Sequence, residues 1–578
     1  MYSDPPPQDS RSDEPGPNLH LMTTASTPAT PGPSTPTAMR SLLPLEQIKI
    51  DGHDEDIVPP ARPKSTPFPE ADMVEGDIQC LQRMNDGDRT DALSRLPIIL
   101  TFNTSPLCGL PTEIHDCILD HLFGQRNSAA LRTTGTGKTK ILRSWGTALR
   151  HSRRREVAEL SLVSHKWREL VQDRLYRHLK IKGTTESVDH ALSWFALHHH
   201  LCSYVKHIEI WFPVFQQKNP AFDRTFRAPT PDRTATSARS LSPTESTALV
   251  TYQSPSNNCA LEDIFRFVQT TFGEACILTL EGGDRKKPPQ VKHFRDPKPW
   301  SVLPKVTQIN TLVCKGQWNI IRSNEDFQNI SAALPNLNEW HGLYAKPKSK
   351  SYISMAAILP HLPRNLTHLN LCLENDYRRE AVSPLFVRKV GLRTHFCLEL
   401  AKAIPTLEHL AFTGRICKCF FDDAAKLSSA RTSRMKSIDL IVKNVCRPTH
   451  VWNDGTGITD MAFIQAFEAL VVSSVKSLDK LAALEFLRIR FIDLESQVPA
   501  LNPYFHFQDN YCTGIWSDSI IDIMQRNRPG IVLAEKSENV DIGFKDGQLL
   551  APGSFSKIRP LSINISSYAN LTGGITIN

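Results

Sequence analysis

Cysteine is the residue type in this sequence with the most evident chemistry, because thiolates bind metal ions. The chain has 13 cysteines, which lie between Cys80 and Cys512 without a repeated spacing. Cys417 and Cys419 form one C-x-C pair, but no second pair completes a tetrahedral zinc site. The sequence therefore predicts no bound metal, and the cysteines are expected to be small buried apolar residues in a reducing compartment.

A run of histidines at 198–200, followed by Cys202 and His207, is a second possible metal cluster. Adjacent histidines on a helix or turn point in different directions, so a solvated loop before a strand at 205 is the better interpretation. No Ser-His-Asp arrangement and no H-E-x-x-H or G-x-S-x-G motif is present. The sequence therefore predicts a protein that is not an enzyme and uses no cofactor.

The segment TTGTGKTK at 133–140 is close to a nucleotide-binding P-loop. Gly137, Lys138 and Thr139 fit the end of that motif. Arg132, however, stands where the first glycine must let the backbone wrap the phosphates, and no buried strand leads into the loop. Nucleotide hydrolysis is therefore not expected.

Positive charge is concentrated in one segment of the chain. The formal net charge is +7, and residues 125–156 hold nine Lys and Arg residues against one acid, Glu156. The basic residues are Arg126, Arg132, Lys138, Lys140, Arg143, Arg150, Arg153, Arg154 and Arg155. The rest of the chain is nearly neutral, so the charge does not favour nucleic acid as a partner. The stretch 150–156 fits a nuclear-import cluster, a patch for phosphate or acidic protein, or a solvated loop.

Composition predicts a folded core between disordered parts. Residues 1–70 contain 15 of the 41 prolines and are expected to be a disordered tail, followed by a linker over 71–104. The polar stretch 216–258 is expected to be a disordered loop. No stretch approaches the roughly 18 consecutive apolar residues of a membrane helix, and no signal-peptide layout is present. These features predict no membrane contact and a location in the cytoplasm, the nucleus or both.

A repeated helix–strand unit is predicted in the second half of the chain. Segments 330–340, 355–373 and 398–412 each combine an amphipathic helix that ends near a proline with a short strand whose apolar residues are two apart. Further strands of the set are expected at 205–212 and 309–315, and also at 435–442 and 484–492.

The spacing of these strands is irregular. Leu369 and Leu410 are 41 residues apart, Ile438 follows after another 28, and Leu487 after another 49. A regular leucine-rich repeat has a period of about 20–29 residues. We therefore expect a mixed α/β fold with an irregular leucine-rich-repeat-like solenoid over 182–578, and a generic α/β domain is the alternative.

Two amphipathic helices are expected before the repeats. The segment 110–124 begins Leu-Pro-Thr-Glu-Ile, and Ile114, Ile118 and Leu122 form one apolar stripe at intervals of four residues. A second helix is expected at 157–178. Trp167 lies in the middle of its apolar stripe, where a large indole is suited to anchor a helical unit or a partner surface.

The two segments together resemble an F-box, most similar to fungal-type F-box proteins with long C-terminal regions. LPTEI at 110–114 and LSLVSHKWRELVQDRLYRHL at 160–179 carry the resemblance, which covers 110–124 and 157–181. It implies a compact F-box-like helical domain over 105–181, interrupted by the basic insertion 125–156. The entropic cost of such an insertion is tolerable, because the cost of closing a loop grows only logarithmically with its length.

In that family the F-box binds the small adaptor subunit of an SCF-type ubiquitin ligase, and a downstream domain captures the substrate. The resemblance therefore implies the adaptor subunit, and through it a cullin, as partners, with a substrate protein of unknown identity. The positions that match adaptor-contacting or packing positions of the family are Leu110, Pro111, Ile114, Ile118, Leu162, Val163, Trp167 and Leu170.

The strand positions that alternate with the buried leucines are expected to form one continuous partner-binding surface. His368 and His409 occupy such positions, and Arg488 and Arg490 lie two apart on one strand and so face the same side. The two guanidinium groups are candidates for contact with a carboxylate or phosphate, or they keep an exposed strand soluble. The expected function is a substrate-recruiting adaptor. The alternative is a scaffold that is not part of a ligase, in which the F-box-like helices cap the solenoid.

Overall fold

The computed structural model describes the chain in segments. These are residues 110–124, 133–134, 141–142, 149–150, 153–213, 257–283, 290–344, 348–376, 384–447, 457–496, 498–535, 543–545, 548–550 and 562–569. The expected disordered tail 1–70, the linker 71–104 and nearly all of the loop 216–258 lie outside the described residues. The P-loop-like residues Gly137, Lys138 and Thr139 also lie outside them.

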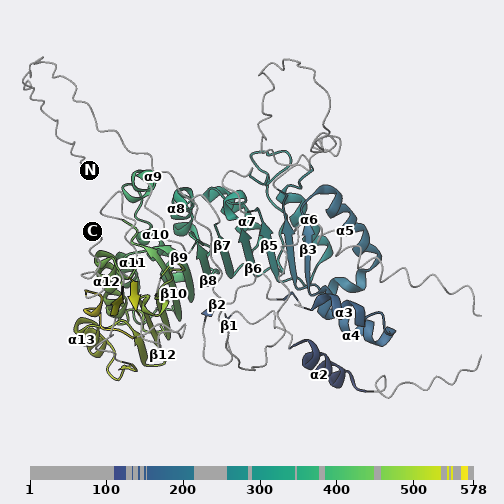
Figure 1. The fold of residues 1–578 in the computed structure, drawn as a ribbon. Coiled ribbons are helices and arrows are strands. Elements are labelled where there is room, and N and C mark those ends of the chain that lie inside the picture. Colours follow the sequence, from purple (N-terminus) through teal and green to yellow (C-terminus); the bar gives the residue numbers. More distant parts are fainter. Residues whose placement is uncertain are drawn as a thin grey trace, which may run out of the picture. The chain divides into compact units, whose positions relative to one another are not determined.

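The described residues form a mixed α/β fold around one sheet of twelve strands, whose order in space is their order in the sequence (Figure 1). The strands from β3 to β11 run parallel to their neighbours. They are β3 (His178–Lys182), β4 (His207–Trp211), β5 (Ile277–Glu281), β6 (Thr311–Lys315), β7 (Glu339–Leu343), β8 (His368–Cys372), β9 (His409–Arg415), β10 (Ser437–Asn444) and β11 (Phe486–Phe491).

Within the described residues, every connection between parallel strands from β3 to β11 contains a helix except that from β5 to β6, and the helices lie along one face of the sheet (Figure 1). Every crossover adds its strand on the same side of the previous one, and right-handed crossovers then place all helices on one face. The helices are α5 (Thr185–Leu197), α6 (Leu261–Thr271), α7 (Asn324–Ala333), α8 (Lys348–Ile358), α10 (Phe396–Ala403), α11 (Cys419–Leu427), α12 (Met461–Ser477) and α13 (Asp518–Asn527). This arrangement is that of a leucine-rich-repeat-like solenoid, as the sequence predicts.

The apolar residues that are irregularly spaced in the sequence lie on directly neighbouring strands of the sheet. Leu369 pairs with Leu410, Leu410 with Ile438, and Ile438 with Leu487. All four side chains are buried in the main apolar core, on the face that the helices cover. The predicted spacings of 41, 28 and 49 residues are therefore single repeats of different length.

Local sequence explains where individual helices start. Ser323 caps α7 by accepting a hydrogen bond from the Asp326 N–H at 3.2 Å, and Asp326 accepts one from the Ser323 N–H at 3.1 Å. Asp460 caps α12 in the same manner, with 3.0 Å to the Ala462 N–H. β3, β5 and the strands after β11 are not among the strands expected from the sequence.

An antiparallel hairpin follows the parallel strands. β12 (Tyr504–Gln508) pairs with β11 and with β13 (Tyr511–Gly514), and the short β14 (Val532–Leu533) is the last strand of the sheet. Asp509 and Asn510 connect β12 to β13 and both have positive φ angles, of 49° and 68°. This is the geometry of a two-residue turn that matches the twist of a hairpin, and these residue types tolerate it.

Two further two-stranded sheets are small. β1 (Thr133–Thr134) pairs with β2 (Ile141–Leu142) inside the basic insertion, and β15 (Gly543–Lys545) pairs with β16 (Gln548–Leu550).

The helix expected at 157–178 is two helices in the structure. α3 (Arg154–Leu160) ends before a turn, and α4 (His165–Tyr176) begins after Ser164, whose side-chain oxygen accepts a hydrogen bond from the Trp167 N–H at 3.2 Å. A serine at this position favours a helix start over a continuous helix. With α2 (Thr112–Phe123), which follows Pro111, the helices in the described residues before β3 are α2, α3 and α4.

Candidate functional site

A buried arginine holds α2 against α4. The Arg174 side chain on α4 is inaccessible to solvent, and its Nη2 donates a hydrogen bond to Asp120 Oδ1 on α2 at 2.6 Å. Asp116 Oδ1 lies 3.8 Å from the same nitrogen, and the Gly124 carbonyl accepts from Nη1 at 3.4 Å. Because a buried guanidinium is costly without partners, these contacts fix the position of the two helices although 54 residues separate Arg174 from Asp120.

Trp167 completes the packing of α2 on α4. The side chain of His115 is buried, and its Nδ1 donates to the Pro111 carbonyl at 3.0 Å. The imidazole meets the half-buried indole of Trp167 edge-on, with ring centroids 5.5 Å apart and an interplanar angle of 87°. Trp167 therefore packs inside the helical unit, and this contact is a role that the residue has independently of any partner.

Large apolar side chains are exposed on the other side of these helices. The exposed fractions are 45 % for Ile114, 50 % for Leu122, 63 % for Leu162 and 67 % for Val163. Leu122 is on α2, and Leu162 and Val163 lie in the turn between α3 and α4. Leu122 and Val163 line one hollow, and exposed apolar side chains that lie close together mark an interaction surface more often than scattered single residues do.

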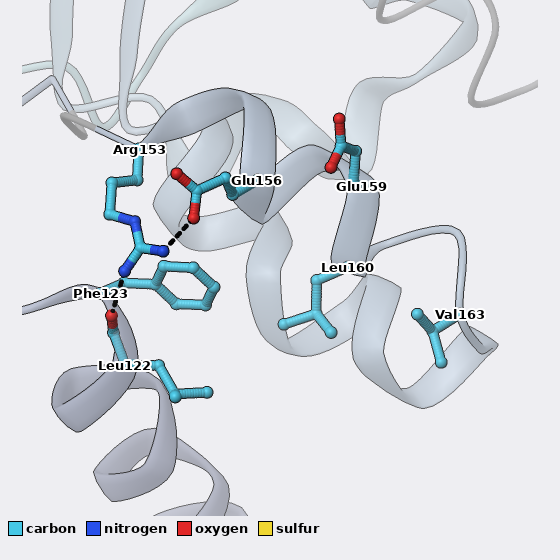
Figure 2. A pocket seen from close by; sticks show the side chains of 7 residues that line it. All are labelled: Leu122, Phe123, Arg153, Glu156, Glu159, Leu160 and Val163. Atoms are coloured by element: carbon cyan, nitrogen blue, oxygen red, sulfur yellow. Dashed lines mark hydrogen bonds and ion pairs between the residues drawn. The ribbon is translucent and has the colours of Figure 1, made fainter. Parts of the chain in front are cut away.

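An open hollow of about 340 Å³ lies between the end of α2 and α3 (Figure 2). Its lining combines apolar and charged side chains. The lining residues are Leu122, Phe123, Arg153, Glu156, Glu159, Leu160 and Val163. Arg153 forms an ion pair with Glu156, donates to the Leu122 carbonyl at 2.7 Å, and lies 5.2 Å from the centre of the Phe123 ring. The lining of the hollow therefore combines apolar side chains with an ion pair.

The predicted adaptor-binding residues divide into two groups by exposure. Pro111, Ile114, Leu162 and Val163 are exposed, whereas Leu110, Ile118, Trp167 and Leu170 are half-buried. The core side of α2 is formed by His115 and Leu119, so the predicted apolar stripe of this helix does not provide its buried face. The structure brings α2 and α4 together as the sequence implied, and contact with an adaptor remains a prediction.

The predicted partner-binding histidines lie on the helix-free face of the sheet, but they are buried. His368 and His409 stack with ring centroids 4.4 Å apart. His409 Nδ1 shares a hydrogen bond of 2.7 Å with Ser437 Oγ, and His368 Nδ1 one of 2.7 Å with Thr367 Oγ1. The expectation that these strand positions are exposed is therefore wrong for both histidines, because their rings stack on each other across β8 and β9 and both side chains are buried.

The two predicted arginines share one carboxylate of the sheet. Arg488 forms a bidentate contact with Asp439, with Nε–Oδ1 at 2.9 Å and Nη2–Oδ2 at 2.7 Å. Arg490 Nη2 lies 3.7 Å from the same Oδ2. The alternation did place both arginines on one face of β11. Asp439 offsets one of the two positive charges and holds Arg488 in a bidentate contact, which weakens the case for two free arginines that bind an anion.

The basic insertion contacts the same helix-free face. Leu149 is buried and packs with Ile277 on β5 and Val313 on β6, in an apolar cluster separate from the main core. β2 of the insertion contacts β9. The described residues Leu149 and β2 therefore pack on the sheet, and this contact bears on none of the alternatives for 150–156. Leu149 and β2 occupy part of the surface on which a partner was predicted.

The histidine run also differs from its prediction. His199–Tyr204 form a 3₁₀ helix instead of a loop, in which His199 and His200 are exposed. His207 is fully buried in β4. Within the described residues these side chains do not converge on one site.

Sequence reasoning missed a cluster that the fold assembles from four positions. His395, Cys397, Cys417 and Cys446 come together, and Cys419, the other half of the C-x-C pair, is not a member. The pair His395-x-Cys397 was a detectable signal. Intervals of 20 and 29 residues to Cys417 and Cys446 fit no common zinc motif, so the repeat topology was needed to connect them.

Two results bear on the class of protein. Within the described parts of the chain, every helix is too short or too polar to cross a lipid bilayer. A comparison with known protein families matches no family model, and a comparison with curated proteins finds no match either.

Proposed function

We propose that this protein recruits substrates to an SCF-type ubiquitin ligase. In this proposal α2, α3 and α4 bind the adaptor subunit, and through it a cullin, and the repeats bind the target protein. The observation that carries the proposal is the exposed apolar surface of Ile114, Leu122, Leu162 and Val163. Burying each such side chain against a partner is worth about 1.5–3 kcal/mol, which is enough to support a stable contact.

The helices have separate faces for folding and for binding. Val171, Leu175 and Tyr176 of α4 belong to the same apolar core as the repeats. Leu162 and Val163, in the turn before α4, project into solvent. A docked adaptor would therefore cover surface that the fold does not need, and the F-box resemblance of the same segments supports that partner.

The proposed role requires no active site. A protein that holds a target beside a ubiquitin-conjugating enzyme accelerates transfer by raising the effective concentration of the target. The exposed apolar surface and the repeats lie in one chain, so one polypeptide would connect the ligase and the target.

A scaffold outside any ligase is the second candidate. The observation that favours it is the continuity of α4 with the solenoid: β3 begins at His178, two residues after Tyr176, and Arg154 of α3 donates to the His178 carbonyl at 3.2 Å. Solenoids need a terminal cap to cover their first apolar face, and these helices fulfil that need. Binding to the adaptor distinguishes the two candidate functions, because helices that only cap the solenoid are not expected to bind the adaptor.

The test is direct binding of the purified full-length chain to the ligase adaptor subunit, measured by calorimetry. The double variant Leu162→Glu/Val163→Glu is expected to bind at least about 30-fold more weakly, because a charged side chain replaces an apolar contact worth about 2 kcal/mol. Trp167→Ala is a poorer test, because this residue also packs against His115.

Leu494→Glu is the matched control. Leu494 is 71 % exposed after β11, eight strands from β3 in the sheet, and its replacement should leave the affinity unchanged. Absence of adaptor binding by the wild-type chain would reject the ligase proposal and favour the scaffold. Equal binding by the double variant would reject the proposed surface.

A further inference from the structure

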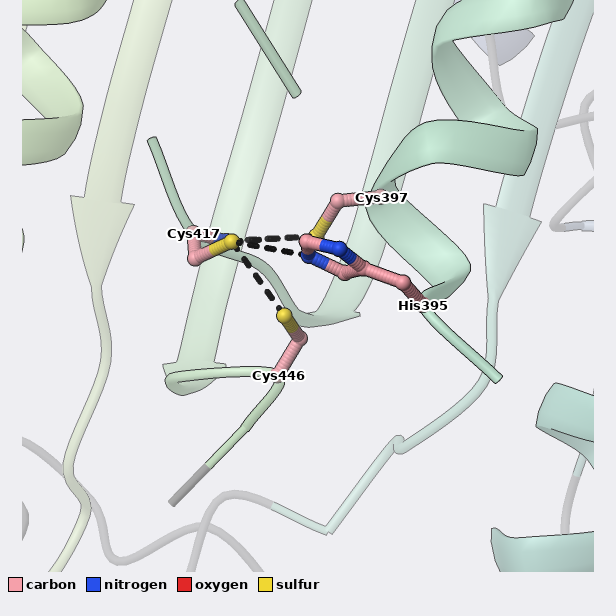
Figure 3. Close-up of side chains that lie close together, drawn as sticks. All are labelled: His395, Cys397, Cys417 and Cys446. Carbon is pink, nitrogen blue, oxygen red and sulfur yellow. Dashed lines mark hydrogen bonds between the residues drawn. The ribbon is translucent and has the colours of Figure 1, made fainter. Parts of the chain in front are cut away.

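Three cysteines and one histidine converge at one edge of the sheet (Figure 3). Their side-chain ligand atoms all lie within 4.8 Å of one another. His395 directly precedes α10 and Cys397 is in its first turn. Cys417 lies between β9 and α11, and Cys446 follows the end of β10. The four residues therefore come from three separate segments of the chain.

The topology explains why these segments meet. β9 and β10 are parallel neighbours, so the residues that follow them, Cys417 and Cys446, emerge at the same edge of the sheet. α10 runs back along the sheet to lead into β9, so its first turn lies at this edge too. The site is thus a product of two consecutive repeats.

The distances from Cys417 Sγ to Cys397 and His395 match those of a tetrahedral zinc site, and its distance to Cys446 is shorter. The Sγ atom of Cys417 lies 3.2 Å from that of Cys446 and 3.7 Å from that of Cys397. Nε2 of His395 lies 3.4 Å from Cys417 Sγ. Zinc–sulfur bonds of about 2.3 Å and zinc–nitrogen bonds of about 2.0 Å separate two sulfurs by about 3.8 Å and sulfur from nitrogen by about 3.5 Å.

The surroundings of the four residues suit a bound cation. The Cys417 N–H donates a hydrogen bond to Cys397 Sγ at 3.3 Å, which orients that sulfur. Three thiolates and a neutral imidazole around Zn²⁺ carry one net negative charge, and the basic residues Lys418 and Arg447 directly follow two of the ligands in sequence. Cys397 and Cys446 are buried, whereas His395 and Cys417 are half-buried and leave an entry route from solvent.

We propose that His395, Cys397, Cys417 and Cys446 bind one Zn²⁺ ion as a closed Cys₃His structural site. Four protein ligands leave no open position for water or substrate, so the ion has a structural role instead of a catalytic one. It connects the start of α10, the β9–α11 connection and the segment after β10. This site therefore fixes two adjacent repeats where the long connection from Asn444 to Met461 begins.

The wild-type chain provides the first test. Full-length protein purified under reducing conditions is expected to contain about one zinc per chain by elemental analysis. Replacement by Co²⁺ should give the visible d–d bands of tetrahedral cobalt together with a thiolate-to-cobalt charge-transfer band. Zinc should also protect three cysteines from alkylation, identified by peptide mass spectrometry as Cys397, Cys417 and Cys446.

Variants identify the ligands. Cys397→Ser, Cys417→Ser, Cys446→Ser and His395→Ala are each expected to lower the zinc content and to lower the melting temperature by about 5 °C or more, since bound metal stabilises the folded state. Cys419→Ser is the matched control, because this residue adjoins the cluster outside the ligand set. It should retain zinc and the cobalt spectrum.

The competing outcomes each overturn the proposal. If the fully reduced chain binds neither zinc nor cobalt, the four residues are not a metal site. A disulfide between Cys417 and Cys446 in the reduced preparation, or a brown iron–sulfur chromophore, would assign the cluster a different chemistry. Loss of metal in Cys419→Ser with retention in Cys417→Ser would refute the ligand set. None of these measurements involves the ligase adaptor, so the result is independent of the proposed function.

Discussion

Arg174 shows how one residue joins parts of the chain that the sequence separates widely. Arg174 and Leu175 are adjacent on α4, and both side chains are buried. The guanidinium is buried because Asp116 and Asp120 on α2 provide its partners. The spacing of apolar residues indicates which hydrophobic side chains are buried. It does not indicate a buried ion pair between two helices.

Arg174→Ala is expected to destabilise the attachment of α2 to α4 by about 2–3 kcal/mol. Breaking a buried ion pair costs about 3–5 kcal/mol when both partners are fully buried, and the two aspartates here are about one-third exposed. Hydrogen exchange of residues 112–123, followed by mass spectrometry, should accelerate correspondingly. Arg155→Ala is the control, because this arginine is exposed and its pair with Glu159 should contribute less than about 1 kcal/mol. Unchanged exchange in Arg174→Ala would contradict the role of the pair.

At the residue scale, the sequence identified chemistry that is continuous in the chain and missed chemistry that is not. Trp167 was correctly singled out as an anchor, but its contact with His115 depends on α2 lying against α4. Cys417 was noticed as half of a C-x-C pair. Its neighbours Cys397 and Cys446 are close because β9 and β10 are adjacent, which a spacing rule for compact zinc motifs does not encode.

At the scale of elements, the first residues of β3 and β4 are buried histidines. His178 and His207 are buried with ring centroids 4.3 Å apart, and His178 Nε2 lies 3.0 Å from Glu209 Oε2. Burial lowers the pKa of His178 despite this carboxylate, and burial lowers the pKa of His207 well below its usual range. Burial would raise the pKa of Glu209, but the His178 hydrogen bond and the Lys315 ammonium outweigh it and lower that pKa.

These shifts predict acid sensitivity below about pH 6.5. The unfolded chain binds protons at both imidazoles near that pH, whereas the folded chain does not, so protonation favours unfolding. The free energy of unfolding, measured with urea between about pH 7.5 and about pH 5.5, should fall by up to about 1.4 kcal/mol per pH unit for each histidine. The contribution of Glu209 is constant in this range, because its lowered pKa matters only below about pH 4.5.

His207→Gln isolates the effect. An amide can retain the hydrogen bond that His207 Nε2 makes with Thr279 Oγ1 at 2.7 Å, but it does not titrate. The variant should therefore show a shallower dependence on pH. A metal chelator present throughout removes any contribution from bound zinc. Stability of the wild-type chain that does not change over this range would disprove the prediction.

The strand ladder was the part of the fold that the sequence predicted best. Alternating leucines on β8 and β9 and the apolar residues of β10 and β11 indicated four strands, which are direct neighbours in the sheet, because one face of each strand is buried against helices. The opposite face was judged exposed. Its burial at His368 and His409 depends on contacts between strands 41 residues apart, which alternation within a single strand does not reveal.

At the scale of the whole molecule, the basic insertion connects two regions with different proposed roles. It follows α2 in sequence, yet Leu149 packs on β5 and β6 of the repeats. Deleting the segment would therefore expose Ile277 and Val313 as well as shorten the helical unit. The insertion is not an independent appendage of the helices.

Leu149→Asp is expected to release the insertion from the sheet. The nine Lys and Arg residues of 125–156 are trypsin sites, and their cleavage should be about tenfold faster or more, because a buried charge opposes the docked state. The digestion is followed by peptide mass spectrometry under native conditions. Val302→Asp, at an 81 % exposed position, should leave the cleavage rate unchanged. Equal rates in Leu149→Asp and wild-type protein would show that Leu149 does not hold the insertion.

The one-directional order of the sheet has a consequence for synthesis. Each strand from β4 to β11 pairs with the strand that was translated immediately before it. A chain leaving the ribosome thus finds a folded template for every new strand, and no apolar strand has to wait for a distant partner. Premature termination within the repeats is accordingly expected to yield a shorter folded product whose last strand is an unpaired edge strand. Such products are expected to associate with one another through that edge.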